Sequence, residues 1–335
     1  MRASAAEIAE DVMRAAQLAA SLEVSGWPKP GNVHRTRDFL DTRFEHYLAG
    51  SIAMGPAVRE AALQGVRVAI GEIEASEIGV GRHVKRSVSD VRRWHGGGNT
   101  HLGVSLLFIP LAAAAGLTFA SRGKVEPGPL RGSVRRVMES TQPQDAVDAY
   151  DAIVEASSAA LGRLGDSEAP DLFDGDARVK ILERGVSLYE AMRVASRWDN
   201  VAREWATGME ASFEVGYPTF RRVFDETRDV NIATVHAFLT ILARHPDTFI
   251  ARKVGAREAA DVREAVRIGL GKSREVSGRA EEVLGLGGLL TEEGRRALFE
   301  LDEDLRGPGH ELNPGTTADL TASSLLVAVL CEFRP

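Results

Sequence analysis

The chain has 335 residues, of which 44% are hydrophobic and 27% charged, a composition typical of soluble globular proteins. Its formal net charge of -7 argues against a nucleic-acid-binding protein, whose affinity comes largely from Lys and Arg contacts to phosphates. Cys331 is the single cysteine, which excludes an intrachain disulfide and a cysteine-rich zinc site. Acidic residues interrupt the apolar stretch that a signal peptide would need in residues 1–20, so we expect a cytoplasmic protein.

Apolar residues recur at helical spacing along most of the chain. In residues 58–73, Val58, Ala62, Val66 and Ile70 repeat every four positions, which is the pattern of an amphipathic helix. The same periodicity predicts helices over residues 3–24, 144–162, 178–196, 199–213, 230–245 and 256–283. Segments rich in Gly, Pro or Asp predict loops over residues 26–42, 121–142, 163–177 and 305–315. Because no stretch alternates apolar and polar residues like a strand, we predict an all-α protein in which residues 1–335 form a single compact domain with buried central helices.

Two apolar segments stand out by their lack of charge. Residues 102–120 are long enough to cross a membrane, but Pro110 interrupts them, four consecutive alanines dilute their hydrophobicity, and no second span follows. A helix that is apolar on all sides lies either in a protein core or in a membrane. We expect a buried central helix here and no membrane partner. Residues 320–330 predict a second such helix, which could be buried within the monomer or in a homodimer interface.

The loop after the first predicted helix gathers polar side chains. Pro28 and Pro30 hold this part of the chain extended. A helix stop explains the prolines but not the five hydrogen-bond donors and two carboxylates that accompany them, namely Lys29, Asn32, His34, Arg35, Arg37, Asp38 and Asp41. Because Lys and Arg bind phosphates and carboxylates bind Mg²⁺, the loop is a candidate site for a phosphate and its metal ion.

The sequence HGGGNTHLG, residues 95–103, opens the apolar helix. Gly96, Gly97 and Gly98 permit positive φ and close approach of a ligand to the backbone. Asn99 or Thr100 can cap the helix, and the free amides of a helix N-terminus bind anions. An ordinary turn is the commoner use of such a loop. A histidine at the start of a helix is more commonly a plain surface or packing residue. His101 could instead bind a phosphate or protonate a leaving group.

The C-terminal apolar helix begins in a similar way. Asn313 and Gly315 lie in the loop before it, and Thr316 and Asp319 have the spacing of a capping box. Asp319 is therefore either a cap or a ligand. Since two helices begin after loops that contain Gly and Asn, their N-termini could converge on one polyphosphate.

A third helix boundary lies at HPDTFIARKVG, residues 245–255. Asp247 occupies a capping position, and Arg252 and Lys253 follow one turn later. The plain interpretation is a cap followed by a solvated basic turn. The alternative is an acidic group and two phosphate-binding cations on one helix.

Four motifs in this order carry a family resemblance. They are PKPGNV at 28–33, GGNTH-x-G at 97–103, DT-x-x-x-RK-x-G at 247–255 and NPG-T-T-ADL at 313–320. Over residues 15–330 the chain resembles the triphosphoribosyl-dephospho-CoA synthase family, and EVSGWPKPGNVHR resembles its archaeal and C1-metabolism branch in particular. The resemblance implies an all-helical enzyme that converts ATP and 3'-dephospho-CoA to 2'-(5''-triphosphoribosyl)-3'-dephospho-CoA and adenine. That product is the precursor of the prosthetic group of citrate lyase or malonate decarboxylase acyl-carrier subunits.

The resemblance also implies roles for matching positions. Nucleotide binding falls to Lys29, Gly31, Asn32, Gly97, Gly98, Asn99, Thr100, Arg252, Lys253, Asn313, Gly315 and Thr316. Candidates for Mg²⁺ are Asp38, Asp41 and Asp319, and candidates for the base are Asp38, Asp41 and Asp247. His101 is the candidate acid for the departing adenine.

The chain departs from the citrate-lyase type at three points. Leu102 replaces a lysine, the Asp38–Asp41 spacing is wider, and GTTADL replaces GGSADL. These differences affect the expected acceptor more than the expected ATP site. A related transferase with another acceptor in cofactor biosynthesis therefore stays open, as do a non-catalytic nucleotide-binding helical protein and a hydrolase of N-glycosidic bonds.

Overall fold

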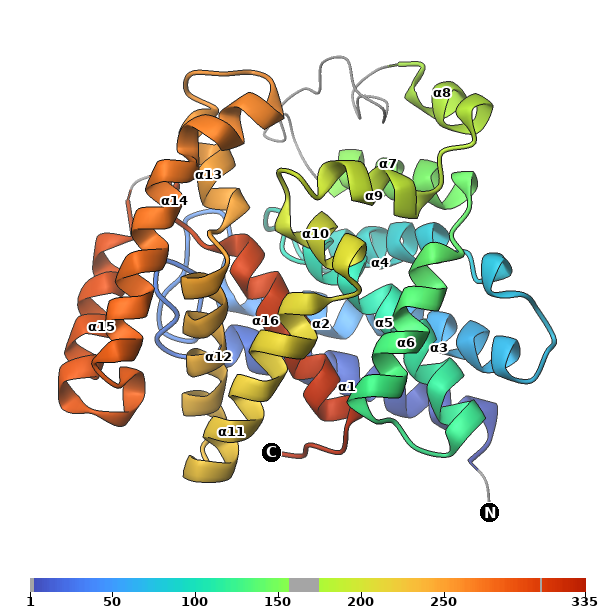
Figure 1. Cartoon of the computed structure of the whole chain (residues 1–335), viewed down its shortest axis with the longest axis horizontal. Helices are drawn as coiled ribbons and strands as arrows, with labels where there is room; N and C mark the ends of the chain where they lie inside the picture. Colours follow the sequence, from blue (N-terminus) through green and yellow to red (C-terminus); the bar gives the residue numbers. More distant parts are fainter. Residues whose placement is uncertain (1–2, 157–174, 308) are drawn as a thin grey trace.

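The computed structural model describes residues 3–156, 175–307 and 309–335, and these are helical almost throughout (Figure 1). The described residues form no strand, only an isolated bridge between His34 and Arg37, so the all-α prediction is confirmed. The helices of the first half are α1 (Ala5–Ser25), α2 (Phe44–Ala53), α3 (Gly55–Ala69), α4 (Val80–Trp94), α5 (Leu102–Arg122), α6 (Pro127–Glu139) and α7 (Pro143–Ala156).

The second half continues with shorter elements before the last long helices. Its helices are α8 (Ala177–Arg184), α9 (Leu188–Ala195), α10 (Asn200–Thr207), α11 (Tyr217–Thr227), α12 (Val230–Arg244), α13 (Thr248–Gly255), α14 (Val262–Gly285), α15 (Glu292–Asp304) and α16 (Gly315–Leu330). Single turns of 3-10 helix, η1 (Ala75–Glu77) and η3 (Gly288–Leu290), and a π-helical stretch, η2 (Ala211–Gly216), lie between them.

Helices α5 and α16, which contain the two uncharged segments 102–120 and 320–330, lie at the centre of the molecule (Figure 1). Within the described part of the chain, α5 is the one helix long and apolar enough to cross a membrane, and 89% of its most apolar window is buried against the rest of the protein. The expectation of a buried central helix is therefore confirmed. Helix α3 crosses α5 at close range, since a Cβ on Gly65 or Gly116 would lie less than 3.0 Å from a backbone carbonyl oxygen of the other helix.

Helix α5 continues through Pro110 instead of ending there. A proline lacks the N–H that would bind the carbonyl four residues earlier, which leaves the Leu106 carbonyl without its helical partner. Trp205 of α10 supplies the missing donor, because its Nε1 lies 3.1 Å from the Leu106 oxygen. The hydrogen bond fixes α10 against α5, and Leu106 lines the cavity described below.

A second apolar cluster joins α12, α14 and α15 on one side of the molecule (Figure 1). The loop of residues 26–42 packs between this cluster and the centre. Its backbone amides at Trp27 and Gly31 donate to Asn231 of α12 and Asp302 of α15. The loop is thereby held next to the N-terminus of α16, although the two segments are far apart in the sequence.

Several predicted boundaries are wrong. The segment 121–142 contains α6, which begins at Pro127 and buries Leu130, Val134 and Val137 at helical spacing. The predicted helix 178–196 is broken by Gly185, and 199–213 is broken by Gly208, both of which have positive φ. The helix predicted over 256–283 begins at Val262 after its N-cap Asp261. The end of the predicted helix 144–162 and most of the predicted loop 163–177 lie outside the described residues.

Candidate active site

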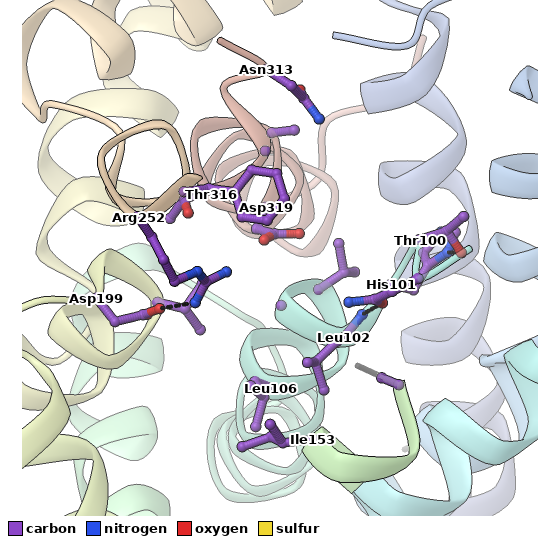
Figure 2. Close-up of a pocket in the computed structure, with 18 of the residues that line it drawn as sticks. Thr100, His101, Leu102, Leu106, Ile153, Asp199, Arg252, Asn313, Thr316 and Asp319 are labelled. Carbon is purple, nitrogen blue, oxygen red and sulfur yellow. Dashed lines mark hydrogen bonds and ion pairs between the residues drawn. The ribbon is translucent and has the colours of Figure 1, made fainter. Parts of the chain in front are cut away.

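A cavity of about 480 Å³ lies between α1, α5, α10, α13 and α16 (Figure 2). This volume is within the usual range of small-molecule sites. It brings together twelve of the residues predicted from the sequence, which are Asn32, Asp41, Gly98, Asn99, Thr100, His101, Arg252, Lys253, Asn313, Gly315, Thr316 and Asp319. All four sequence motifs therefore contribute to one site. The N-terminal ends of α5 and α16 converge on it, as the sequence predicts.

The cavity has a polar end and an apolar end (Figure 2). Asn313 and Thr316 lie at the polar end, and Asp319 lies between them and His101. The apolar end was not predicted, because it is built by side chains outside the four motifs and by the first turns of α5. Its principal members are Leu102, Leu106, Ile153, Leu188, Met192, Trp198 and Val201.

Two cations of α13 face the cavity over the ring of Phe249. The Arg252 guanidinium lies 5.2 Å and the Lys253 ammonium 4.7 Å from the ring centroid. Arg252 is 3.9 Å from Asp199, and its Nε is a buried atom without a hydrogen-bond partner. Lys253 donates to the His310 carbonyl at 2.9 Å. Burial lowers the pKa of both side chains, and nearby carboxylates oppose that shift. Both cations keep free donors for an anionic ligand.

The glycine-rich loop is shaped by close approach and not by positive φ. A Cβ on Gly97 would overlap the His46 ring, while none of the three glycines has a left-handed backbone. His101 is the N-cap residue of α5. The Asn99 Oδ1 accepts a hydrogen bond from the Leu102 amide at 3.1 Å, so Asn99 holds the first turn from two residues before the N-cap. The loop ends at Thr100, whose hydroxyl lies 2.7 Å from the Nδ1 of His101.

His101 is buried at the cavity wall, with 3% of its surface exposed. Desolvation lowers the pKa of its imidazole to about 3, and His95 adds to the shift. The ring is therefore neutral at physiological pH. A neutral imidazole can still donate one hydrogen bond, but it holds no proton that it could readily give to a leaving group.

Asp319 belongs to α16 but reaches across to α5. Pro314, not Thr316, is the N-cap of α16, so the predicted capping box does not form. The Asp319 carboxylate accepts a hydrogen bond from the Val104 amide in the first turn of α5. Desolvation at this half-buried position raises the pKa of Asp319 well above its usual value, and the charge of Glu23 adds to the shift. The surroundings of Asp319 thus favour the protonated form of its carboxyl group.

A chain of buried hydrogen bonds lies behind the polar end. Lys29 is fully buried and donates to the Glu23 carboxylate. Its ammonium also contacts the Asn32 side-chain oxygen at 3.2 Å, and Asn32 donates to Asn313 at 2.8 Å. Lys29 itself does not line the cavity, whereas Glu23 does. No role is predicted for Glu23 from the sequence, although it begins the stretch EVSGWPKPGNVHR and lies on the apolar stripe of α1, where a carboxylate must be buried.

Four of the predicted residues lie outside the cavity besides Lys29. Asp247 is fully buried and accepts from the amides of Phe249 and Ile250 and from the amide and hydroxyl of Thr317. It thereby joins the first turns of α13 and α16 and has no free oxygen for a base. Exposed Asp38 accepts from the Phe44 amide. The other two are Gly31 and Gly97.

The predicted Mg²⁺ ligands are only partly brought together. Asp41 and Asp319 line the cavity, but Asp38 does not. In the part of the chain that the structure describes, no group of three or more His, Cys, Asp or Glu side chains is placed to hold a metal ion. A site built by protein carboxylates alone therefore does not fit.

The chain is similar to known proteins along nearly its whole length. The sequence profile of a family described as ATP:dephospho-CoA triphosphoribosyl transferase matches residues 9–334. A 2-(5''-triphosphoribosyl)-3'-dephosphocoenzyme-A synthase of Klebsiella pneumoniae is 26% identical over 316 residues, which cover 94% of this chain and 89% of that protein. A crystal structure of an Archaeoglobus fulgidus protein described as a triphosphoribosyl-dephospho-CoA synthase matches with a TM-score of 0.58 at 24% identity. The match covers 86% of this chain and 100% of that one, and it supports the fold alone. Because the family profile spans nearly the whole chain, the protein belongs to the ATP:dephospho-CoA triphosphoribosyl transferase family.

Proposed function

We propose that the protein transfers the 5-triphosphoribosyl group of ATP to a ribose hydroxyl of 3'-dephospho-CoA and releases adenine. The observation that carries this proposal is the two-ended cavity. Arg252, Lys253 and the start of α16 supply cationic and amide groups at one end, and apolar side chains form the other. The polar end suits a triphosphate that must be held without being cleaved, and the apolar end suits a purine or a pantetheine arm.

The triphosphate would bind to the free donors of Arg252 and Lys253 and to the first turn of α16. Asp41 lies on the cavity wall, and its charge opposes the lowering of the Lys253 pKa by burial. We expect Mg²⁺ to be held between Asp41 and the phosphates, where it would neutralise part of their charge. Gripping the phosphates in this way would fix the ribose near Asp319 and His101, which line the same cavity (Figure 2).

Displacement of adenine at the ribose C1' requires a proton for the leaving ring. The low pKa of His101 makes it unsuitable as that donor. Asp319 lines the same cavity, and burial raises the pKa of its carboxyl group well above the usual value, which favours the protonated form. We therefore assign the acid to Asp319 in place of a metal role, and we assign His101 to hydrogen bonding of the substrate.

The test is to incubate the purified protein with ATP, Mg²⁺ and 3'-dephospho-CoA and to measure free adenine by chromatography. Adenine that forms only with the acceptor supports the proposal. Adenine without acceptor would indicate a hydrolase, and ATP binding without adenine would indicate a nucleotide-binding protein.

A related transferase with a different acceptor is the second candidate. Leu102 supports this candidate. It is the first residue of α5 and presents an apolar side chain to the cavity where the citrate-lyase type carries a lysine. Release of adenine with another ribosyl acceptor, but not with 3'-dephospho-CoA, would establish this candidate instead.

A further inference from the structure

Glu23, the first residue of the stretch EVSGWPKPGNVHR, is a carboxylate in the cavity and has no role among those predicted from the sequence. It lies in the last turn of α1, has 5% of its surface exposed and lines the cavity together with Asp319. The two carboxyl groups are close enough for the charge of Glu23 to raise the pKa of Asp319. Glu23 therefore faces the same cavity as the group proposed to protonate the leaving adenine.

One side of the Glu23 carboxylate is held in place. Its Oε1 accepts a hydrogen bond from Lys29, whose side chain is fully buried and oriented in turn by Asn32. Among the described residues, no other side chain or amide donates to this carboxylate, so its second oxygen is left for the cavity. Burial raises the pKa of Glu23, and the Lys29 ammonium opposes that shift. A carboxylate that Lys29 orients, and whose pKa is raised by burial but lowered by the ammonium, suits a general base.

A purely structural ion pair explains this arrangement less well. Two buried charges lose hydration free energy, and a neutral pair of similar volume is often as stable. The Lys29 ammonium does not line the cavity, whereas the carboxylate does. The asymmetry makes sense if Lys29 serves to hold Glu23 in its ionised form at the cavity wall.

We propose that Glu23 is the base that accepts the proton of the attacking acceptor hydroxyl. In this step the acceptor oxygen forms a bond to C1' and its proton passes to Glu23. The C1'–N bond breaks, its electron pair goes to adenine, and the ring takes one proton from Asp319. One carboxyl group gains the proton that the other loses, so charge in the site balances. The inference rests on the proposed function.

The test compares two variants with the wild type in adenine release and in ATP binding by calorimetry. Glu23→Gln leaves the Lys29 charge buried without a partner and can destabilise the fold. The double variant Glu23→Gln/Lys29→Met removes both charges and keeps the approximate volume. We expect its turnover to fall by about 100-fold or more, with ATP affinity within about threefold of the wild type.

Glu204 provides a matched control, because it is another buried glutamate and lies outside the cavity in a network with Ser212. Turnover per folded molecule of Glu204→Gln should stay within about twofold of the wild type. If the folded double variant keeps more than a tenth of wild-type turnover, the pair is structural and the inference fails. A wild type that releases no adenine would instead refute the proposed function, so the two failures are distinct.

Discussion

Gly103 of α5 lies directly against the carboxylate of Asp319 in α16, and a Cβ on residue 103 would lie less than 3.0 Å from both carboxylate oxygens. The contact explains two motif positions together. Glycine is needed at position 103 because the Asp319 side chain of α16 occupies the space that a Cβ on residue 103 would take. The first turns of α5 and α16 are thereby held at the distance that the cavity requires.

The variant Gly103→Ala should displace the Asp319 carboxylate. We expect turnover to fall by about 100-fold, because a displacement of about 1 Å at a reacting group has costs of that order. The measurement is kcat for adenine release. Gly132→Ala is the control, since no atom lies within 4 Å of its Cβ position in α6, and it should leave kcat unchanged. Equal kcat values for both variants would contradict the assigned role of the contact.

Asp319→Asn should change the pH dependence of stability. Because the pKa of Asp319 is raised in the folded protein, its contribution to stability is complete below the unfolded pKa of about 3.9 and is lost as pH rises through the folded pKa. The wild type should therefore lose more thermal stability than the variant between pH 5 and pH 8. Melting temperatures at both pH values measure this. Parallel pH profiles would show that Asp319 is ionised throughout.

Arg252→Met should weaken ATP binding. Loss of a charge-assisted hydrogen bond costs about 1.5–3 kcal/mol, which corresponds to a roughly 10- to 150-fold rise in the dissociation constant. Adenosine, which has no phosphates, should bind equally well to the variant and the wild type. Calorimetric titration distinguishes the two ligands, and Arg274→Met, at an exposed position of α14, is the control. A similar loss for adenosine would place Arg252 at the base end of the cavity.

Trp205→Phe should destabilise the fold by leaving the Leu106 carbonyl without a donor. The expected loss is about 1–3 kcal/mol in the free energy of unfolding, measured with urea. Trp94→Phe is the control, since 67% of Trp94 is exposed.

A double-mutant cycle sharpens the test. In a Pro110→Ala background the residue 110 amide can bind the Leu106 carbonyl, so Trp205→Phe should cost less than it does in the wild type. An equal cost in both backgrounds would show that the indole acts only through packing.

The fold class and much of the polar site could be predicted, because helical periodicity and local motifs are properties of short segments. The Asn99 side chain accepts from the first amide of α5, and α5 is buried as the lack of charge in residues 102–120 suggests. The apolar end of the cavity could not be predicted, since Ile153 and Met192 belong to ordinary amphipathic helices whose packing brings them together. Asp247 satisfies the pattern of a reactive carboxylate, but its Oδ2 accepts tertiary hydrogen bonds from Thr317 and is not available to a substrate.

The most direct test of the central claim is the amount of adenine released per acceptor consumed, with 3'-dephospho-CoA as acceptor and a parallel reaction without it. The account predicts one adenine for each 3'-dephospho-CoA converted, a product heavier by the triphosphoribosyl group, and no adenine in the parallel reaction. Adenine release that is independent of the acceptor, or a product that lacks the triphosphate, would contradict it.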